Sequence, residues 1–102
     1  VQHLEKRYFE VGDLGFPVIR APVGEQEANI GMMICNDRRW PEAWRVLGLQ
    51  QVEIVMLGYN TPSLNMDNRG FEAHHLRVEH SHLSIRAGCY QNACYAVAVA
   101  KA

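Results

Sequence analysis

The chain has 102 residues, of which 48 % are hydrophobic and 21 % are charged. These proportions are typical of globular proteins and exclude a disordered, collagen-like or coiled-coil chain, and the length admits one small domain at most. Ten basic and eleven acidic residues give a formal net charge of −1, so the sequence does not favour a surface that binds nucleic acid.

The cysteines and the two ends indicate the setting of the chain. Cys35, Cys89 and Cys94 are odd in number and contain no CxxC pair, so we interpret them as reduced thiols of a cytoplasmic protein. No apolar run reaches the roughly 20 residues that cross a membrane. The chain does not begin with Met and stops where a buried strand finishes, so we expect residues 1–102 to be the central part of one domain, incomplete at both ends.

The first predicted elements are a hairpin and a buried strand. Residues 16–19 are apolar, and Pro22 and Gly24 supply a turn within residues 21–26. Residues 30–35, IGMMIC, form a nearly continuous apolar run that is too short for a helix. Such a run is typical of a strand buried on both faces of a sheet.

A helix and a second buried strand come next. Pro41 suits the first position of a helix, and Gly48 is predicted to end it. Trp40 and Trp44 are predicted to anchor the core below the turn that precedes this helix. Residues 52–57, VEIVML, predict the second strand.

A longer helix and a last strand complete the pattern. Residues 71–87 have a period of three and four that predicts an amphipathic helix stopping at Gly88, and residues 93–100 alternate as a strand. The order strand, helix, strand, helix, strand predicts an α/β fold with a largely parallel sheet. The positions that define the helical period are Phe71, His75, Val78, His82 and Ile85.

A reactive side chain stands at the end of the first buried strand. In α/β sheets, functional groups gather at the carboxyl ends of the strands. Cys35 lies at such an end, just before a helix, where backbone N–H groups favour a thiolate and can bind an oxyanion. A strand cysteine is also often a small buried hydrophobe, but the neighbours of Cys35 favour a nucleophile.

These neighbours predict a pocket for an acid. Arg38 and Arg39 follow the cysteine, and Asn60 and Thr61 follow the next strand. A pair of arginines on a surface is usually a solvated charge patch. At the mouth of a strand-end cleft, however, guanidinium groups hold a carboxylate through two parallel hydrogen bonds, and the neutral side chains add further donors.

The histidines of the second helix raise the alternative of a metal site. His75 and His82 are two turns apart, and no clear pair of ligands at i and i+4 appears. We therefore expect no metal and no cofactor. His80 is instead a candidate for the lining of the substrate cleft.

The longest specific motif is Cys35 followed by Asn-Asp-Arg-Arg-Trp-Pro-Glu. It lies in GMMICNDRRWPEAWRVLGLQQVEIVMLGYNTP, with HLEKRYFEVGDLGFPV before it and AGCYQNACYAVAVAKA after it. Through these blocks the sequence resembles the nitrilase superfamily of carbon–nitrogen hydrolases. Within that superfamily it is most similar to the enzymes that hydrolyse N-carbamoyl-D-amino acids.

The resemblance implies a four-layer α-β-β-α sandwich and a Glu-Lys-Cys triad in which Cys35 is the nucleophile. Its thiolate would attack the carbamoyl carbon, ammonia would leave, and water would release carbon dioxide and the free D-amino acid. Asn36 would donate a backbone N–H to the oxyanion. Glu5 would orient the catalytic lysine, with Glu10 as the competing choice. The residues that match the family's carboxylate-binding positions are Arg38, Arg39, Asn60 and Thr61.

The chain also departs from the family. The general-base glutamate and the lysine match positions upstream of Val1, and neither Lys6 nor Lys101 stands in the lysine motif. We therefore expect the 102-residue chain alone to be inactive. The resemblance also implies a homo-oligomer for the complete protein. Other members of the superfamily, such as an aliphatic amidase, a β-ureidopropionase or a nitrilase, and a non-catalytic scaffold of the same fold remain as alternatives.

Overall fold

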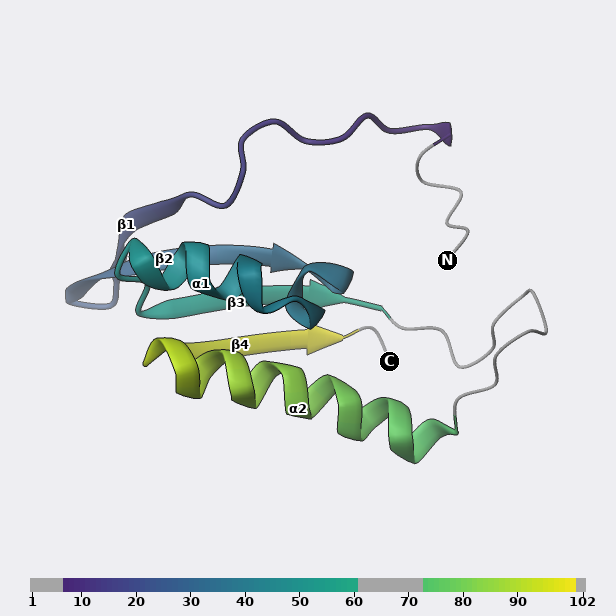
Figure 1. Cartoon of the computed structure of the whole chain (residues 1–102). Helices are drawn as coiled ribbons and strands as arrows, with labels where there is room; N and C mark the ends of the chain where they lie inside the picture. The colour runs from purple at the N-terminus through teal and green to yellow at the C-terminus, as the bar shows by residue number, and fades with distance from the viewer. Residues whose placement is uncertain (1–6, 61–72, 101–102) are drawn as a thin grey trace.

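The computed structural model describes residues 7–60 and 73–100, which form a four-stranded sheet with two helices packed on one face (Figure 1). The strands lie in the order β1-β2-β3-β4; β1 is antiparallel to β2, and the other neighbours are parallel. The predicted α/β class is confirmed. The elements are β1 (Val18–Val23), β2 (Gln26–Ile34), the 3-10 helix η2 (Cys35–Arg39), α1 (Pro41–Leu49), β3 (Ile54–Tyr59), α2 (His74–Asn92) and β4 (Tyr95–Ala100).

The predicted hairpin is formed by β1 and β2. Gly24 lies in its turn with φ of +63°, a left-handed conformation that glycine adopts without steric cost. The β2 strand begins earlier than its apolar run because its polar start pairs with β1. There the Arg20 Nε donates to Glu27 Oε2 at 2.9 Å, and Arg20 Nη1 donates to Asn29 Oδ1 at 3.0 Å.

The register of the parallel strands places the end of β2 beside the end of β3. Ile34 pairs with Gly58, and Tyr59 pairs with Ala100. Cys35 directly follows β2 and Asn60 directly follows β3, so both residues lie at the same carboxyl edge of the sheet. This is the edge on which the sequence predicted a site.

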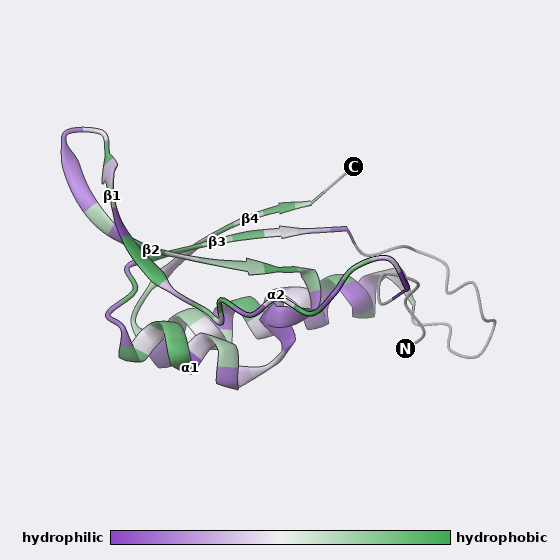
Figure 2. Ribbon diagram, turned by 90° about the horizontal axis from the view of Figure 1, so that it is seen from above, coloured by the Kyte–Doolittle hydropathy of each residue, from purple (hydrophilic) through white to green (hydrophobic). Residues whose placement is uncertain are grey.

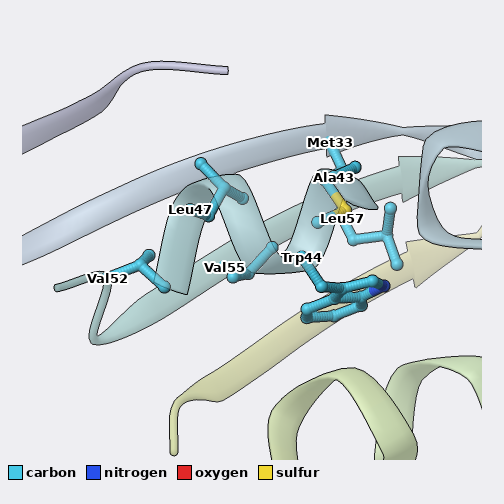
Figure 3. Packing of buried hydrophobic residues seen from close by; sticks show 7 residues of the cluster. All are labelled: Met33, Ala43, Trp44, Leu47, Val52, Val55 and Leu57. Carbon is cyan, nitrogen blue, oxygen red and sulfur yellow. The ribbon is translucent and has the colours of Figure 1, made fainter. Parts of the chain in front are cut away.

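The core fills the space between α1 and the sheet (Figure 3). Leu47 is fully buried, and a Cβ added at Gly31 would lie 2.8 Å from its Cδ2 atom. A side chain at position 31 would therefore push the helix away from β2. The buried members of the core are Met33, Ala43, Trp44, Leu47, Val52, Val55 and Leu57.

The α2 helix does not stop at Gly88, as the sequence predicted, but continues to Asn92. Gly88 is buried against the indole of Trp44, and a Cβ at position 88 would lie 2.2 Å from the ring atom Cδ2. This glycine therefore serves close packing between α1 and α2 and does not end the helix. The chain instead leaves the helix at Ala93, whose φ of 50° is left-handed.

The predicted buried face of α2 is confirmed at Ile85, which packs against the core, and is wrong at His75, Val78 and His82, which are exposed. Phe71 lies outside the described residues. The side that packs on the rest of the molecule also contains Ser81, which contacts Arg38, and Gly88, which lies against Trp44. Trp44 is a core anchor as predicted, but Trp40 is 57 % exposed.

The second face of the sheet is apolar. Side chains alternate across a strand, and the members of β2, β3 and β4 that point away from the helices are exposed and apolar. They are Met32, Ile34, Met56, Val97 and Val99. The strands were expected to be buried on both faces, but the helices of the described residues cover one face alone, as Figure 2 shows from above. None of the helices in residues 7–60 and 73–100 is long and apolar enough to span a membrane.

The burial of Leu47 provides a direct test of the core. We expect Leu47→Ala to lower the free energy of unfolding by about 2–5 kcal/mol, because it removes buried methyl groups and leaves a cavity. Leu49→Ala is the matched control, since Leu49 lies in the same helix but is 76 % exposed. Chemical denaturation of both variants measures the difference, and equal losses would contradict this packing.

Candidate active site

Cys35 occupies a tight turn between β2 and α1. Its φ of 47° lies in the left-handed region, which costs a non-glycine residue about 1–3 kcal/mol. The side chain of Asp37 stabilises the turn, because its Oδ2 accepts a hydrogen bond of 2.9 Å from the backbone N–H of Ile34. The Asp37 carbonyl accepts a longer bond of 3.4 Å from the Trp40 N–H. Local hydrogen bonds thus hold the cysteine in a conformation that it would not adopt alone.

Arg38 is the buried charged residue of this turn, with 2 % of its surface exposed. Its Nη1 donates to the carbonyl oxygen of Cys35, and its Nε donates to Ser81 Oγ in α2 at 3.3 Å. The guanidinium also lies 4.2 Å from the centroid of the Tyr59 ring, a cation–π contact with the end of β3. One side chain therefore links the Cys35 turn to α2 and β3.

The backbone of Arg38 connects the same turn to the core. Its carbonyl oxygen accepts a hydrogen bond of 2.8 Å from the indole Nε1 of Trp44. Trp44 belongs to α1, and its buried ring packs against Gly88 of α2. The position of the turn therefore depends on the helix packing, because a shift of Trp44 would break this bond.

A cationic hollow of about 330 Å³ lies between η2 and α2. Three guanidinium groups line it, from Arg38, Arg39 and Arg77. Arg39 is exposed, whereas Arg38 is engaged with the turn. This volume suits a ligand of the size of an amino acid, and the charge suits an anion. The remaining lining residues are His80, Ser81, Leu83 and Ser84.

The structure gathers some of the predicted site residues and separates others. Arg38, Arg39 and His80 meet in the hollow, one turn along the chain from Cys35. Asn36 is exposed beside the cysteine, and Asn60 is exposed at the end of β3. Glu5 and Thr61 lie outside the described residues.

The sequence interpretation missed Arg77, Ser81 and Ser84 as members of this hollow. They recur with His80 at helical steps of three and four, which puts them on one face of α2. The signal in the sequence is a polar stripe, which a pattern of apolar positions does not reveal. No group of three or more histidine, cysteine or acidic side chains is arranged to bind a metal within the described part of the chain.

The other two thiols have a different electrostatic environment. Burial raises the pKa of Cys89 and Cys94, and the neighbouring Cys89 thiol adds to the effect on Cys94, whose pKa reaches about 11. Both thiols are therefore protonated at neutral pH, and neither is a ready nucleophile.

Comparison with known proteins places the chain in one family. All of residues 1–102 match the model of the carbon–nitrogen hydrolase family. The chain belongs to this family, which is part of the nitrilase superfamily.

Curated relatives match parts of the chain. An N-carbamoylputrescine amidase of Arabidopsis thaliana is 37 % identical over 82 residues, covering 76 % of this chain and 25 % of its own. An N-carbamoylputrescine amidase of Solanum lycopersicum is 43 % identical over 51 residues, which are 50 % of this chain and 16 % of the relative. A formamidase of Bradyrhizobium sp. strain ORS 278 is 41 % identical over 56 residues, 53 % and 16 % of the two chains.

Solved structures share the fold. A carbon–nitrogen hydrolase from Helicobacter pylori G27 has a TM-score of 0.79 and 29 % identity, over 94 % of this chain and 31 % of that one. The amidase from Nesterenkonia sp. AN1, in a mutant with acrylamide added to its active-site cysteine, has a TM-score of 0.70 and 16 % identity. That match covers 98 % of this chain and 33 % of the amidase. The chain thus spans about a third of these structures and a quarter or less of the curated relatives.

The buried guanidinium makes a prediction for stability. Arg38→Met removes the donor groups that serve Ser81 and the Cys35 carbonyl, so we expect a loss of about 1–3 kcal/mol in the free energy of unfolding. Arg39→Met changes an exposed neighbour and should stay within about 0.5 kcal/mol of the parent protein. Denaturant titration of the two variants tests the assignment, and a larger loss for Arg39→Met would reverse it.

Proposed function

We propose that the complete protein hydrolyses a carbon–nitrogen bond of a small N-carbamoyl compound, with the Cys35 thiolate as nucleophile. The observation that carries the proposal is the placement of Cys35 in a hydrogen-bonded turn at the carboxyl edge of the sheet, in a chain of the carbon–nitrogen hydrolase family. A rigid turn at this edge presents a thiol to a bound substrate with little loss of entropy.

The proposed reaction has two stages. The Cys35 thiolate attacks the carbamoyl carbon, the backbone N–H of Asn36 donates to the oxyanion, and ammonia leaves. Water then attacks the thioester-like carbamoyl-enzyme and frees the thiol, giving carbon dioxide and the amine. The proton transfers require a general base and a lysine outside the described residues, and we propose that Glu5 orients that lysine.

We further propose that the substrate is an N-carbamoyl-D-amino acid. The three guanidinium groups of the hollow favour an anionic ligand, and Arg39 is the exposed member beside the Cys35 turn. In this proposal the carboxylate lies against Arg39 and His80, with Asn60 and Thr61 as neutral donors. Arg38, the other arginine of the motif, is buried in the wall of the hollow and would contribute its positive charge without being exposed to solvent.

A substrate without a carboxylate is the second candidate. It is favoured by the relatives, since the amidases of Solanum lycopersicum and Arabidopsis thaliana are named for N-carbamoylputrescine and the Bradyrhizobium protein for formamide. These compounds share with N-carbamoyl amino acids a carbonyl carbon bonded to an NH₂ group. The two candidates therefore use the same chemistry at Cys35 and differ in the group that the hollow binds.

Alkylation tests the role of Cys35. We expect iodoacetamide at pH 8 to label Cys35 first in the complete protein and an N-carbamoyl substrate to slow that labelling. Cys89 and Cys94 are internal controls, since burial raises the pKa of both thiols and keeps them protonated. Peptide mass spectrometry gives the rate at each cysteine. Equally slow labelling of all three would favour a non-catalytic scaffold.

A substrate panel separates the two candidates. We expect kcat/KM to be higher for an N-carbamoyl-D-amino acid than for N-carbamoylputrescine or formamide. Arg39→Met should raise KM for the carboxylate substrate by about tenfold or more, equivalent to about 1.4 kcal/mol, and leave KM for the other two unchanged. Cys35→Ala, the control for the chemistry, should abolish turnover of all three. A higher kcat/KM for N-carbamoylputrescine or for formamide would establish the second candidate instead.

A further inference from the structure

The end of α2 brings together two thiols that the proposed reaction does not use. Ala93 leaves the helix in a left-handed conformation, and the N–H of Cys94 donates to the carbonyl oxygen of Cys89 at 3.1 Å. This bond between the first and the sixth residue of a turn is the mark of a Schellman motif, in which the side chains of these two residues commonly touch. Here these two residues are Cys89 and Cys94, both of which pack against the core cluster. Their thiols lie close enough for each to affect the pKa of the other.

We propose that Cys89 and Cys94 form an oxidation site that closes to an intramolecular disulfide in the folded protein. The Schellman bond fixes the backbone on both sides of the pair, so the sulfur atoms meet without unfolding of α2 or β4. Both residues are half-buried and pack against the core cluster, which keeps the pair together. The pair is separate from Cys35. Cys35 follows the carboxyl end of β2, whereas Cys94 precedes the amino end of β4.

The oxidant is a hydroperoxide. The thiolate of one cysteine attacks a peroxide oxygen, the O–O bond breaks, and water or an alcohol leaves while a sulfenic acid forms. The second sulfur then attacks the sulfenic sulfur, the S–O bond breaks, and a second molecule of water leaves. Two thiols are oxidised by two electrons, and one hydroperoxide is reduced.

The surroundings of the pair determine its rate of oxidation. Burial raises the pKa of both thiols, that of Cys94 to about 11, so the thiolate that attacks the peroxide is scarce at neutral pH. The thiolate fraction grows roughly tenfold for each pH unit below the pKa, and the rate should grow with it.

Mass spectrometry of a single peptide tests the proposal. Trypsin cleavage after Arg86 and Lys101 releases residues 87–101, which contain both cysteines of the pair and exclude Cys35. We treat the native complete protein with hydrogen peroxide at pH 7, 8 and 9, block remaining thiols with N-ethylmaleimide, and digest it. The expected product is this peptide without maleimide and lighter by two hydrogen atoms, formed faster at each higher pH.

Serine variants provide the controls. Cys35→Ser should form the same product at the same rate, since the nucleophile takes no part. Cys89→Ser and Cys94→Ser should each lose it and retain one cysteine for maleimide. The proposal is overturned if the parent peptide carries two maleimides after Cys35 has been fully oxidised, if either cysteine is found bonded to Cys35, or if the rate does not change with pH.

Discussion

The buried guanidinium of Arg38 is the interaction on which the geometry of the site depends. A positive charge removed from water is costly unless each of its donors is satisfied, and here the partners come from three separate elements. The Cys35 carbonyl, Ser81 of α2 and the Tyr59 ring must all be in place at once. The same requirement that keeps Arg38 buried therefore brings the turn, the long helix and the end of β3 to fixed relative positions.

The two neighbouring arginines have different roles in the structure. Arg38 is buried and hydrogen-bonds within the protein, whereas Arg39 is exposed to solvent at the hollow. Two adjacent arginines in a sequence do not show which of them is buried. That depends on which side chain the backbone of the turn directs toward the interior. The charge of Arg38 still contributes to the field in the hollow, since a buried charge is less screened by salt than an exposed one.

The strands and the site edge could be predicted from the sequence because each has a local cause. The apolar runs define β2 and β3, Pro41 begins α1, and the parallel order brings Cys35 and Asn60 to one edge. The face of α2 could be predicted at Ile85 but not at the histidines, because the packing of this helix depends on Trp44 and Arg38 from other elements. Glycine is a common residue at the end of a helix, but Gly88 lies inside α2 and packs against the indole of Trp44.

The family was predictable from the motif that follows Cys35, and its choice of substrate was not. In the proposed function, the thiol determines which bond is attacked, and the charge of the hollow selects the rest of the substrate. The hollow contains arginines, whereas the relatives are named for N-carbamoylputrescine and for formamide. In the proposed function the reaction and the recognition of the substrate depend on different residues, so one can change while the other is kept.

The pairing of Ile34 with Gly58 has a consequence for how this protein can evolve. Successive side chains of a strand point to opposite faces, so one inserted residue in β2 would move Met33 out of the core and rotate the Cys35 turn away from Tyr59. Substitutions within β2 change the packing by small amounts, but an insertion changes every contact beyond it. The length of this strand should consequently vary less among descendants than its composition.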